Sequence, residues 1–364
     1  MMSDPAVPRP PKKIHGARLP HLLRVRSDRI PMNGGTAKAA MTFRAGAPVV
    51  VSEPGLLIGA DVGGTGIKAV LADPDGTVHA RIARPTAAEG SPYATLVHVL
   101  DTLAGEALDA GQPLSGIGAA VPGIVDRHTG TVVRATNLDW HELELTHRLR
   151  HRYAVPVTVD HDARAAADAE WAARAAVGEQ VEDAAFVPIG TGIAAALRIG
   201  GRTVTGARCA AGEFGHVVVV AGGEPCTCGG HGCLEAYASA SAIGRRYERA
   251  GGRRLPDAAV VAQSISSDPV AARVWVEAVD ALARGLVGLI ALSDPELVVI
   301  GGGLSSAGAV LLNPLRSRVA AQLPWRRPPR IEQSLTGPEA GQLGALLLAG
   351  ARRTPEPVVR SLRV

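Results

Sequence analysis

Four potential metal ligands lie close together between residues 216 and 233. They are one imidazole and three thiols, from His216, Cys226, Cys228 and Cys233. Three thiolates and one imidazole form a closed tetrahedral set for structural Zn²⁺, with no open position for a reacting water. The Cys-x-Cys spacing is tighter than usual, but glycines at 229, 230 and 232 allow the loop to wrap an ion. We therefore expect a structural zinc site rather than buried or reactive free thiols.

Three glycine-rich turns follow apolar runs that are predicted to be strands. Glycine lets the backbone approach a phosphate closely, and the freed N–H groups can bind it. An acid beside such a turn can hold Mg²⁺ through water. One Gly-Gly turn alone would be an ordinary hairpin, but three at strand ends favour a nucleotide held in a cleft between two sheets. The nucleotide-binding candidates are Asp61, Gly63, Gly64, Thr65, Lys68, Gly190, Thr191, Gly192, Gly301, Gly302 and Gly303.

The elements that must position these residues alternate between strands and helices. Strands are predicted at 56–60, 67–72, 77–83, 116–121, 155–159, 184–189, 194–199 and 297–300. Helices are predicted at 94–110, 163–177, 238–250, 271–292 and 339–352. This alternation predicts an α/β fold with sheets covered on both faces.

Composition limits the class of protein. Hydrophobic residues make up 46% of the 364 residues and charged residues 20%, which excludes a wholly disordered chain. Four Cys are too few for a disulfide scaffold at this length. No apolar run approaches the roughly 20 residues that span a membrane, and the N-terminus has no secretory apolar region. We expect a cytoplasmic protein.

The first fifty residues differ in charge from the rest. They contain nine Lys and Arg against two Asp, a formal charge of +7, whereas the whole chain carries +4. Their prolines exclude long helices. Such a basic stretch could bind nucleic acid, but we expect residues 1–54 to be a disordered or non-native tail.

Several segments carry a resemblance to a known family. Residues 212–235 read GEFGHVVVVAGGEPCTCGGHGCLE and resemble the signature of the ROK family, which groups bacterial sugar kinases with related repressors. DVGGTGIK at 61–68, VPG at 121–123, Asn137-Leu138 before Trp140, and VDHDARAAADAE at 159–170 fall in family order. The resemblance covers about residues 55 to 350.

The resemblance implies a fold of two actin-like, RNase H-like α/β domains with a cleft between them. Residues 55–168 would form the small domain, and residues 169–338 the large domain with the zinc loop. The helix at 339–352 would pack back on the small domain. Relatives form dimers or tetramers, so a homo-oligomer is expected.

The resemblance also assigns roles within the site. Asp162 matches the base that accepts the sugar hydroxyl proton, although its position before a helix would by itself favour an N-cap. His161 and Arg164 depart from the family, where Asn is usual at both positions, and this leaves the sugar open. The expected sugar contacts are Asn137, His161, Glu213, His216 and Glu235, with His216 also a zinc ligand.

These expectations lead to one favoured activity and several alternatives. The favoured one is an ATP- and Mg²⁺-dependent kinase for the 6-hydroxyl of glucose or a similar hexose. An amino-hexose or N-acetylhexosamine kinase is the alternative within the class, and polyphosphate could replace ATP. A sugar-responsive repressor would need about 60 residues of winged helix-turn-helix, which the Pro-rich tail does not resemble, so nucleic-acid binding is not expected. A metal-bound sugar sensor without turnover is the last alternative.

Overall fold

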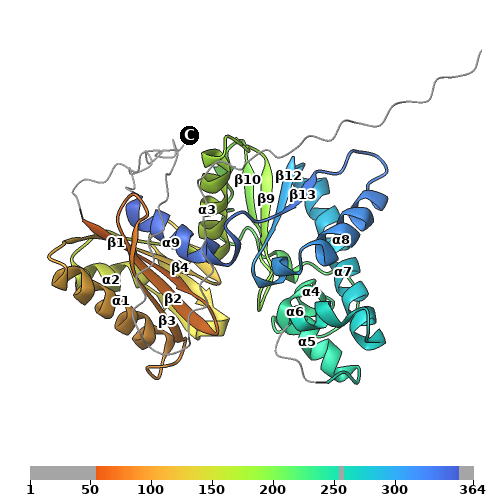
Figure 1. Ribbon diagram of the computed structural model, residues 1–364, viewed down its shortest axis with the longest axis horizontal. Coiled ribbons are helices and arrows are strands. Elements are labelled where there is room, and N and C mark those ends of the chain that lie inside the picture. The colour runs from red at the N-terminus through yellow and green to blue at the C-terminus, as the bar shows by residue number, and fades with distance from the viewer. Residues whose placement is uncertain (1–54, 254–257, 352–364) are drawn as a thin grey trace, which may run out of the picture. The chain divides into compact units, whose positions relative to one another are not determined.

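The computed structural model describes residues 55–253 and 258–351 (Figure 1). The predicted tail at 1–54 and the last residues, 352–364, lie outside the described part, as do residues 254–257. Within the described ranges, no helix combines the length and the apolar character needed to cross a membrane.

Five strands form the first sheet, in the order β3-β2-β1-β4-β8. They are β1 (Leu56–Val62), β2 (Gly66–Ala72), β3 (Val78–Pro85), β4 (Leu114–Val121) and β8 (Val157–His161). β2 runs antiparallel to β1 and β3, whereas β1, β4 and β8 are parallel to one another. The carboxyl ends of these three parallel strands therefore meet at one edge, where α/β sheets bind ligands.

Helices cover both faces of this sheet. Alternate residues of β1, such as Ile58 and Ala60, pack in one core with α1 (Pro92–Asp109). The other face carries glycines under α9 (Ala340–Gly350). A Cβ at Gly118 would lie 1.9 Å from the carbonyl oxygen of Ala345, so α9 sits directly on the strand backbone. Helix α9 also crosses α3 (Asp162–Ala176) closely (Figure 1).

The second sheet has the order β11-β10-β9-β12-β13. Its strands are β9 (Ala184–Pro188), β10 (Ala196–Ile199), β11 (Arg202–Thr203), β12 (Leu297–Gly301) and β13 (Arg330–Gln333). β9, β12 and β13 are parallel, and β10 is antiparallel to β9 and β11. Val187 and Ile300 face a core with α7 (Pro269–Ser293) and α8 (Ala309–Ala321), whereas Phe186 packs edge-on against Trp171 of α3.

The α/β class predicted from the sequence is confirmed, and the helix expected over 238–250 is found as α5 (Ala240–Arg249). A short helix that was not expected, α4 (Glu235–Ala238), directly precedes it. Ser239 separates them because its backbone is extended and its hydroxyl accepts a hydrogen bond from the N–H of Ala242, which caps α5.

Several elements were not expected from the sequence. A third sheet joins β5 (Ile124–Asp126), β6 (Thr131–Ala135) and β7 (Trp140–Leu143) in sequence order. The additional helices are α2 (Leu145–Tyr153), α6 (Ala258–Ser264) and α8. Short 3₁₀ turns are η1 (Thr136–Leu138), η2 (Phe214–His216), η3 (Gly303–Ala307) and η4 (Gly337–Glu339).

Candidate functional site

The first glycine turn joins β1 to β2 directly after Asp61. The N–H of Gly63 donates to the carbonyl of Gly66 at 2.9 Å, and the Thr86 hydroxyl donates to the carbonyl of Gly63 at 2.6 Å. Asn137, which lies in the η1 turn, packs its amide against Gly64, where a Cβ would come within 3.1 Å of Asn137 Nδ2. The turn is thus a true hairpin turn, and it also brings the predicted sugar contact Asn137 to the predicted phosphate loop.

The Asp61 carboxylate is held in an unfavourable electrostatic position. Burial and then the negative charge of Asp162 raise the pKa of Asp61 to about 6, while its cross-strand neighbour Lys68 opposes that rise. Gly341, in the first turn of α9, leaves room for this carboxylate, because a Cβ there would lie 2.5 Å from Asp61 Oδ2. A cation beside Asp61 and Asp162 would relieve the repulsion between them.

Asp162 is the first residue of α3 and does not cap it. The cap position belongs to His161, whose side chain makes no capping hydrogen bond. Asp162 Oδ1 accepts from the N–H of Ala163 at 2.6 Å and lies 3.4 Å from His161 Nε2. Since Oδ1 makes both contacts and the side chain is 37% exposed, Oδ2 is the oxygen available to a substrate proton.

His161 lies at the end of β8 and is buried, with 5% of its surface exposed. Its Nδ1 is enclosed and has no hydrogen-bond partner in the described part of the chain. A buried polar atom without a partner costs free energy unless a ligand or a water completes it. The other departure from the family pattern, Arg164, is also buried and pairs with Asp160, so its guanidinium is not a sugar contact.

The second and third glycine turns lie against each other. They follow the paired, parallel strands β9 and β12. The N–H of Leu304 donates to the carbonyl of Ile189 at 3.0 Å, and a Cβ at Gly302 would lie 2.4 Å from that same oxygen. Gly302 has a φ of 71°, which favours glycine. The N–H of Ala240 donates to the carbonyl of Gly190 at 2.8 Å, so the start of α5 reaches the same place.

Glu235 connects the second turn to the loop with the metal ligands. Its Oε2 accepts a hydrogen bond from the N–H of Ile193 at 2.9 Å. A Cβ at Gly192 would lie 2.6 Å from Oε2, and one at Gly215 would lie 3.2 Å from it. Glu235 is therefore partly buried and bonded, whereas Glu213 is 41% exposed.

The four predicted metal ligands converge. The ligand atoms of His216, Cys226, Cys228 and Cys233 all lie within 4.8 Å of one another. His216 Nδ1 is 3.7 Å from Cys226 Sγ, and Cys228 Sγ is 3.7 Å from Cys233 Sγ. Zn–S bonds of about 2.3 Å in a tetrahedron place sulfurs about 3.8 Å apart, so the spacing fits one zinc ion. His216 Nε2, which faces away from Cys226, lies 3.9 Å from Glu213 Oε2.

The predicted residues thus form three groups. The first group contains Asp61, the 63–65 turn, Asn137, His161 and Asp162. The second group contains the 190–192 and 301–303 turns, and the third contains the metal ligands with Glu213. Glu235 connects the third group to the second. Sequence reasoning missed Gly341, which makes room for Asp61, and Glu170, whose buried carboxylate accepts the N–H groups of Leu335 and Thr336. The spacing of Glu170 and Arg174, four residues apart on a helix, was the available signal.

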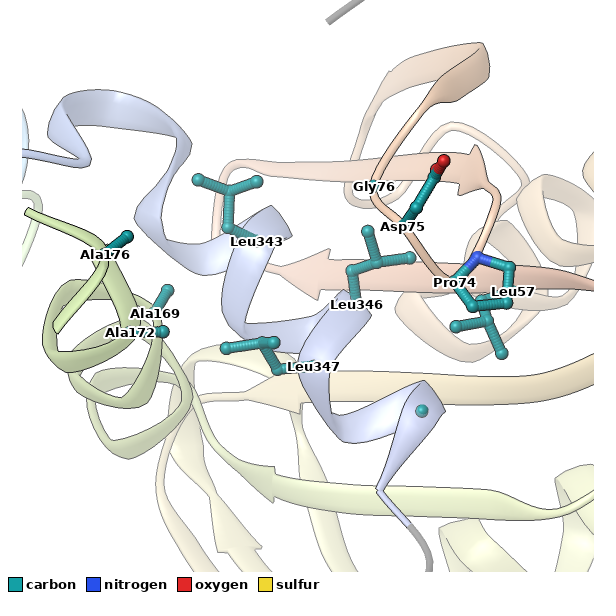
Figure 2. Close-up of a pocket in the computed structure, with 11 residues that line it drawn as sticks. Leu57, Pro74, Asp75, Gly76, Ala169, Ala172, Ala176, Leu343, Leu346 and Leu347 are labelled. Atoms are coloured by element: carbon teal, nitrogen blue, oxygen red, sulfur yellow. The ribbon is translucent and has the colours of Figure 1, made fainter. Parts of the chain in front are cut away.

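A separate apolar pocket lies away from these groups, between α3, α9 and the β2–β3 turn (Figure 2). Leu347 of α9 points toward Ala169 and Ala172 of α3, whereas Leu346 points toward the turn with Pro74 and Asp75. Polar side chains are few there, so it does not suit a sugar or a nucleotide.

Comparison with known proteins assigns the chain to a family. The sequence profile of the ROK family matches residues 57–352. The chain belongs to the ROK family. It is 32% identical to a glucokinase of Streptomyces coelicolor over 84% of this chain and 100% of that protein. It is 35% identical to a glucokinase of Thermotoga maritima over 72% of this chain and 86% of that protein.

A solved structure agrees with this assignment. The ROK family glucokinase of Streptomyces griseus, in complex with glucose and AMPPNP, is 31% identical and superposes with a TM-score of 0.69. The match covers 81% of this chain and 99% of that one. Other relatives bear other names: a Shewanella N-acetylgalactosamine kinase is 28% identical over 80% of this chain and 95% of its own length. A putative xylose repressor of Caldicellulosiruptor is 31% identical over 72% of this chain and 69% of its own length.

Proposed function

We propose that this ROK protein is an ATP-dependent hexose kinase that phosphorylates the 6-hydroxyl of glucose or a glucose-like sugar. The observation that carries the proposal is Asp162, which lies at the carboxyl edge of the first sheet with one carboxylate oxygen available. Its neighbour Asp61 is close enough for the two charges to repel. Glucokinases of the same family, one solved with glucose and AMPPNP, support both the acceptor and the donor.

The reaction needs one proton acceptor and an arrangement that stabilises the transferred group. Asp162 Oδ2 accepts the proton of the sugar hydroxyl as its oxygen bonds to the γ-phosphorus. The bond from that phosphorus to the β,γ-bridging oxygen breaks, which gives ADP, the sugar 6-phosphate and one proton. Backbone N–H groups of the three glycine turns hold the phosphates, and the charge that develops on them is stabilised there.

The residues present fit Mg²⁺ at Asp61. Burial and the charge of Asp162 raise the pKa of Asp61, and Lys68 only partly opposes this rise. The negative charge of Asp61 is therefore not fully compensated by the protein. Mg²⁺ usually keeps several waters and binds through one or two carboxylates together with substrate phosphates. When bound, it would neutralise phosphate charge during transfer. Lys68 and the three turns would complete the nucleotide site.

The cluster of His216, Cys226, Cys228 and Cys233 fits structural Zn²⁺. Its donor set is closed and its two measured ligand spacings match a tetrahedron. The ion would hold the loop in shape and would not activate water. Ligation through His216 Nδ1 would leave Nε2, near Glu213, for a sugar hydroxyl.

The remaining sugar contacts follow from their placement. Asn137 and His161 lie with Asp162 in the first group, and Glu213, His216 and Glu235 lie in or beside the metal loop. We assign the small domain to residues 55–168 and the large domain to residues 169–338, with the sugar held by both. The cytoplasmic location, predicted from the apolar pattern of the sequence, and the dimer or tetramer, predicted from the resemblance, stay predictions.

The second candidate is an N-acetylhexosamine or amino-hexose kinase. Two observations support this candidate: His161 places a ring beside the base where Asn is usual, and an N-acetylgalactosamine kinase is 28% identical to this chain. A repressor without kinase activity is less well supported, since Asp61 and Asp162 are both present.

One assay separates these candidates. ADP release is measured with glucose, mannose, galactose, glucosamine and the N-acetylated hexoses, with ATP or polyphosphate as donor. Glucose-dependent ADP release supports the proposal, and a preference for an N-acetylated sugar transfers it to the second candidate. If no sugar stimulates ADP or phosphate transfer, and the full chain binds DNA instead, the kinase proposal is wrong.

A further inference from the structure

A buried ion pair lies directly behind the proposed base. Asp160 and Arg164 are each about 1% exposed, and their charged atoms are 2.7 Å apart. The same Asp160 oxygen accepts a hydrogen bond from the backbone N–H of His161 at 2.7 Å. The pair therefore holds the peptide between Asp160 and His161, one residue before Asp162.

The guanidinium of Arg164 also reaches two distant segments. Nη2 donates to the carbonyl of Val125 at 3.3 Å, in the strand after the 121–123 turn. Nη1 donates to the carbonyl of Cys209 at 3.2 Å, in the segment that leads to Glu213 and His216. Cys209 has a φ of 55°, which a non-glycine residue rarely adopts and which its surroundings must hold in place.

We infer that Arg164 is a positioning residue that ties the base at Asp162 to the segment bearing Glu213 and His216. The inference rests on the proposed kinase function. It goes beyond that function because it assigns a role to Arg164, a residue that is not among the proposed sugar or nucleotide contacts. Arginine suits this role, since its planar fork donates in several fixed directions at once. A lysine has a single ammonium group and cannot hold Asp160 and the two carbonyls in the same geometry.

The same helix contains a matched pair that separates this role from plain stability. Arg174 is also about 1% exposed and is paired with a buried acid four residues earlier, Glu170. Its remaining donors reach Glu179 and Glu332 and not the Cys209 segment. Arg164→Lys and Arg174→Lys therefore remove equally buried guanidinium groups from one helix, but only the first loosens the segment before Glu213.

Steady-state kinetics and backbone exchange test the inference. Arg164→Lys should raise KM for the preferred hexose about tenfold, while KM for ATP stays within about twofold. Hydrogen–deuterium exchange should accelerate across residues 204–213. Arg174→Lys should lower the melting temperature but leave the hexose KM and the exchange of 204–213 at parental values. An unchanged hexose KM in Arg164→Lys, or an equal rise in Arg174→Lys, overturns the inference.

Two further measurements keep the test decisive. If Arg164→Lys does not fold, Asp160→Asn is tested in its place, because Asn retains the shape and an oxygen acceptor but removes the charge. We expect a smaller rise in the hexose KM and a smaller acceleration of exchange over 204–213. Parental values of both would overturn the inference. If the parent phosphorylates no hexose, the proposed function fails separately. Exchange over 204–213 then decides alone: acceleration specific to Arg164→Lys supports the tie, and unchanged exchange rejects it.

Discussion

The carboxylate of Asp61, at the end of β1, lies within electrostatic reach of Asp162, at the start of α3, and burial together with this repulsion raises the pKa of Asp61 to about 6. The two residues are about a hundred positions apart in the sequence but meet because β1 and β8 end at the same edge of the sheet. Two acids that repel in the ligand-free protein form a suitable place for a divalent cation and a phosphate.

The raised pKa of Asp61, caused by burial and by the charge of Asp162, predicts that the stability of the ligand-free protein depends on pH. In the folded protein Asp61 keeps its proton up to about pH 6, whereas in the unfolded chain it loses the proton near pH 3.8. Between these values the folded state binds more protons, so the contribution of Asp61 to stability falls as pH rises from about 4 to 6 and stays low above that. Asp61→Asn should raise the melting temperature at pH 7–8 by about 2–4 °C while abolishing kinase activity.

Thermal unfolding across pH 4–8 checks this prediction. Asp75→Asn is the control, because Asp75 lies in the exposed β2–β3 turn and Asn can keep its hydrogen bond to the N–H of Thr77. The control should follow the parental pH curve. If Asp61→Asn is no more stable than the parent at neutral pH, then the charged form of Asp61 does not destabilise the folded protein and the prediction is wrong.

Replacement of the proposed base has a separate signature. Asp162→Asn keeps the size of the side chain but cannot accept the hydroxyl proton, so kcat should fall by about 10²–10⁴ while hexose binding persists. Asp168→Asn is the matched change within α3, because Asp168 is half-buried, accepts a hydrogen bond from the Thr203 hydroxyl and lies outside the site. Near-parental kcat in Asp162→Asn would refute its assignment as the base.

The zinc cluster predicts a metal-dependent loop. Cys228→Ser should release the metal and raise the hexose KM, since Glu213, His216 and Glu235 lie on or beside the loop. Cys209→Ser removes a thiol outside the cluster and should keep one zinc per chain. Elemental analysis of both proteins is the measurement; a folded, active parent that contains no zinc contradicts the assignment.

The sequence predicted the site best where the signal was local. Asp61 was singled out because it lies near the end of an apolar run, Asp162 because of the family resemblance, and the metal ligands because they lie within one short segment. The start of α5 was nearly predicted as well, since the expected helix begins at residue 238 and serine, which caps α5 at Ser239, is a frequent N-cap.

The contacts that the sequence could not predict act over long sequence distances. Arg164 bonds to carbonyl groups 39 and 45 positions away, and Glu170 to a segment about 165 positions away. The partners of Arg164 and Glu170 cannot be predicted from sequence spacing, because only the fold brings each residue to its partners. The third sheet was missed because its strands are only three to five residues long and give little alternation of apolar and polar residues.

His161 should determine which hexose is accepted. Its Nε2 faces the Asp162 carboxylate, so the fitting tautomer carries the proton on Nε2 and leaves the buried, unpartnered Nδ1 as an acceptor for a substrate hydroxyl or amine. An Asn at this position offers both an acceptor and a donor, but from a smaller, differently shaped group. His161→Asn should therefore change the ratio of kcat/KM between glucose and an amino or epimeric hexose by about tenfold, the effect of one unpaired buried polar group. His141→Asn, an exposed change on β7, should leave that ratio unaltered. A uniform shift of kcat/KM for every sugar would mean that His161 supports the fold around Asp162 and does not select the substrate.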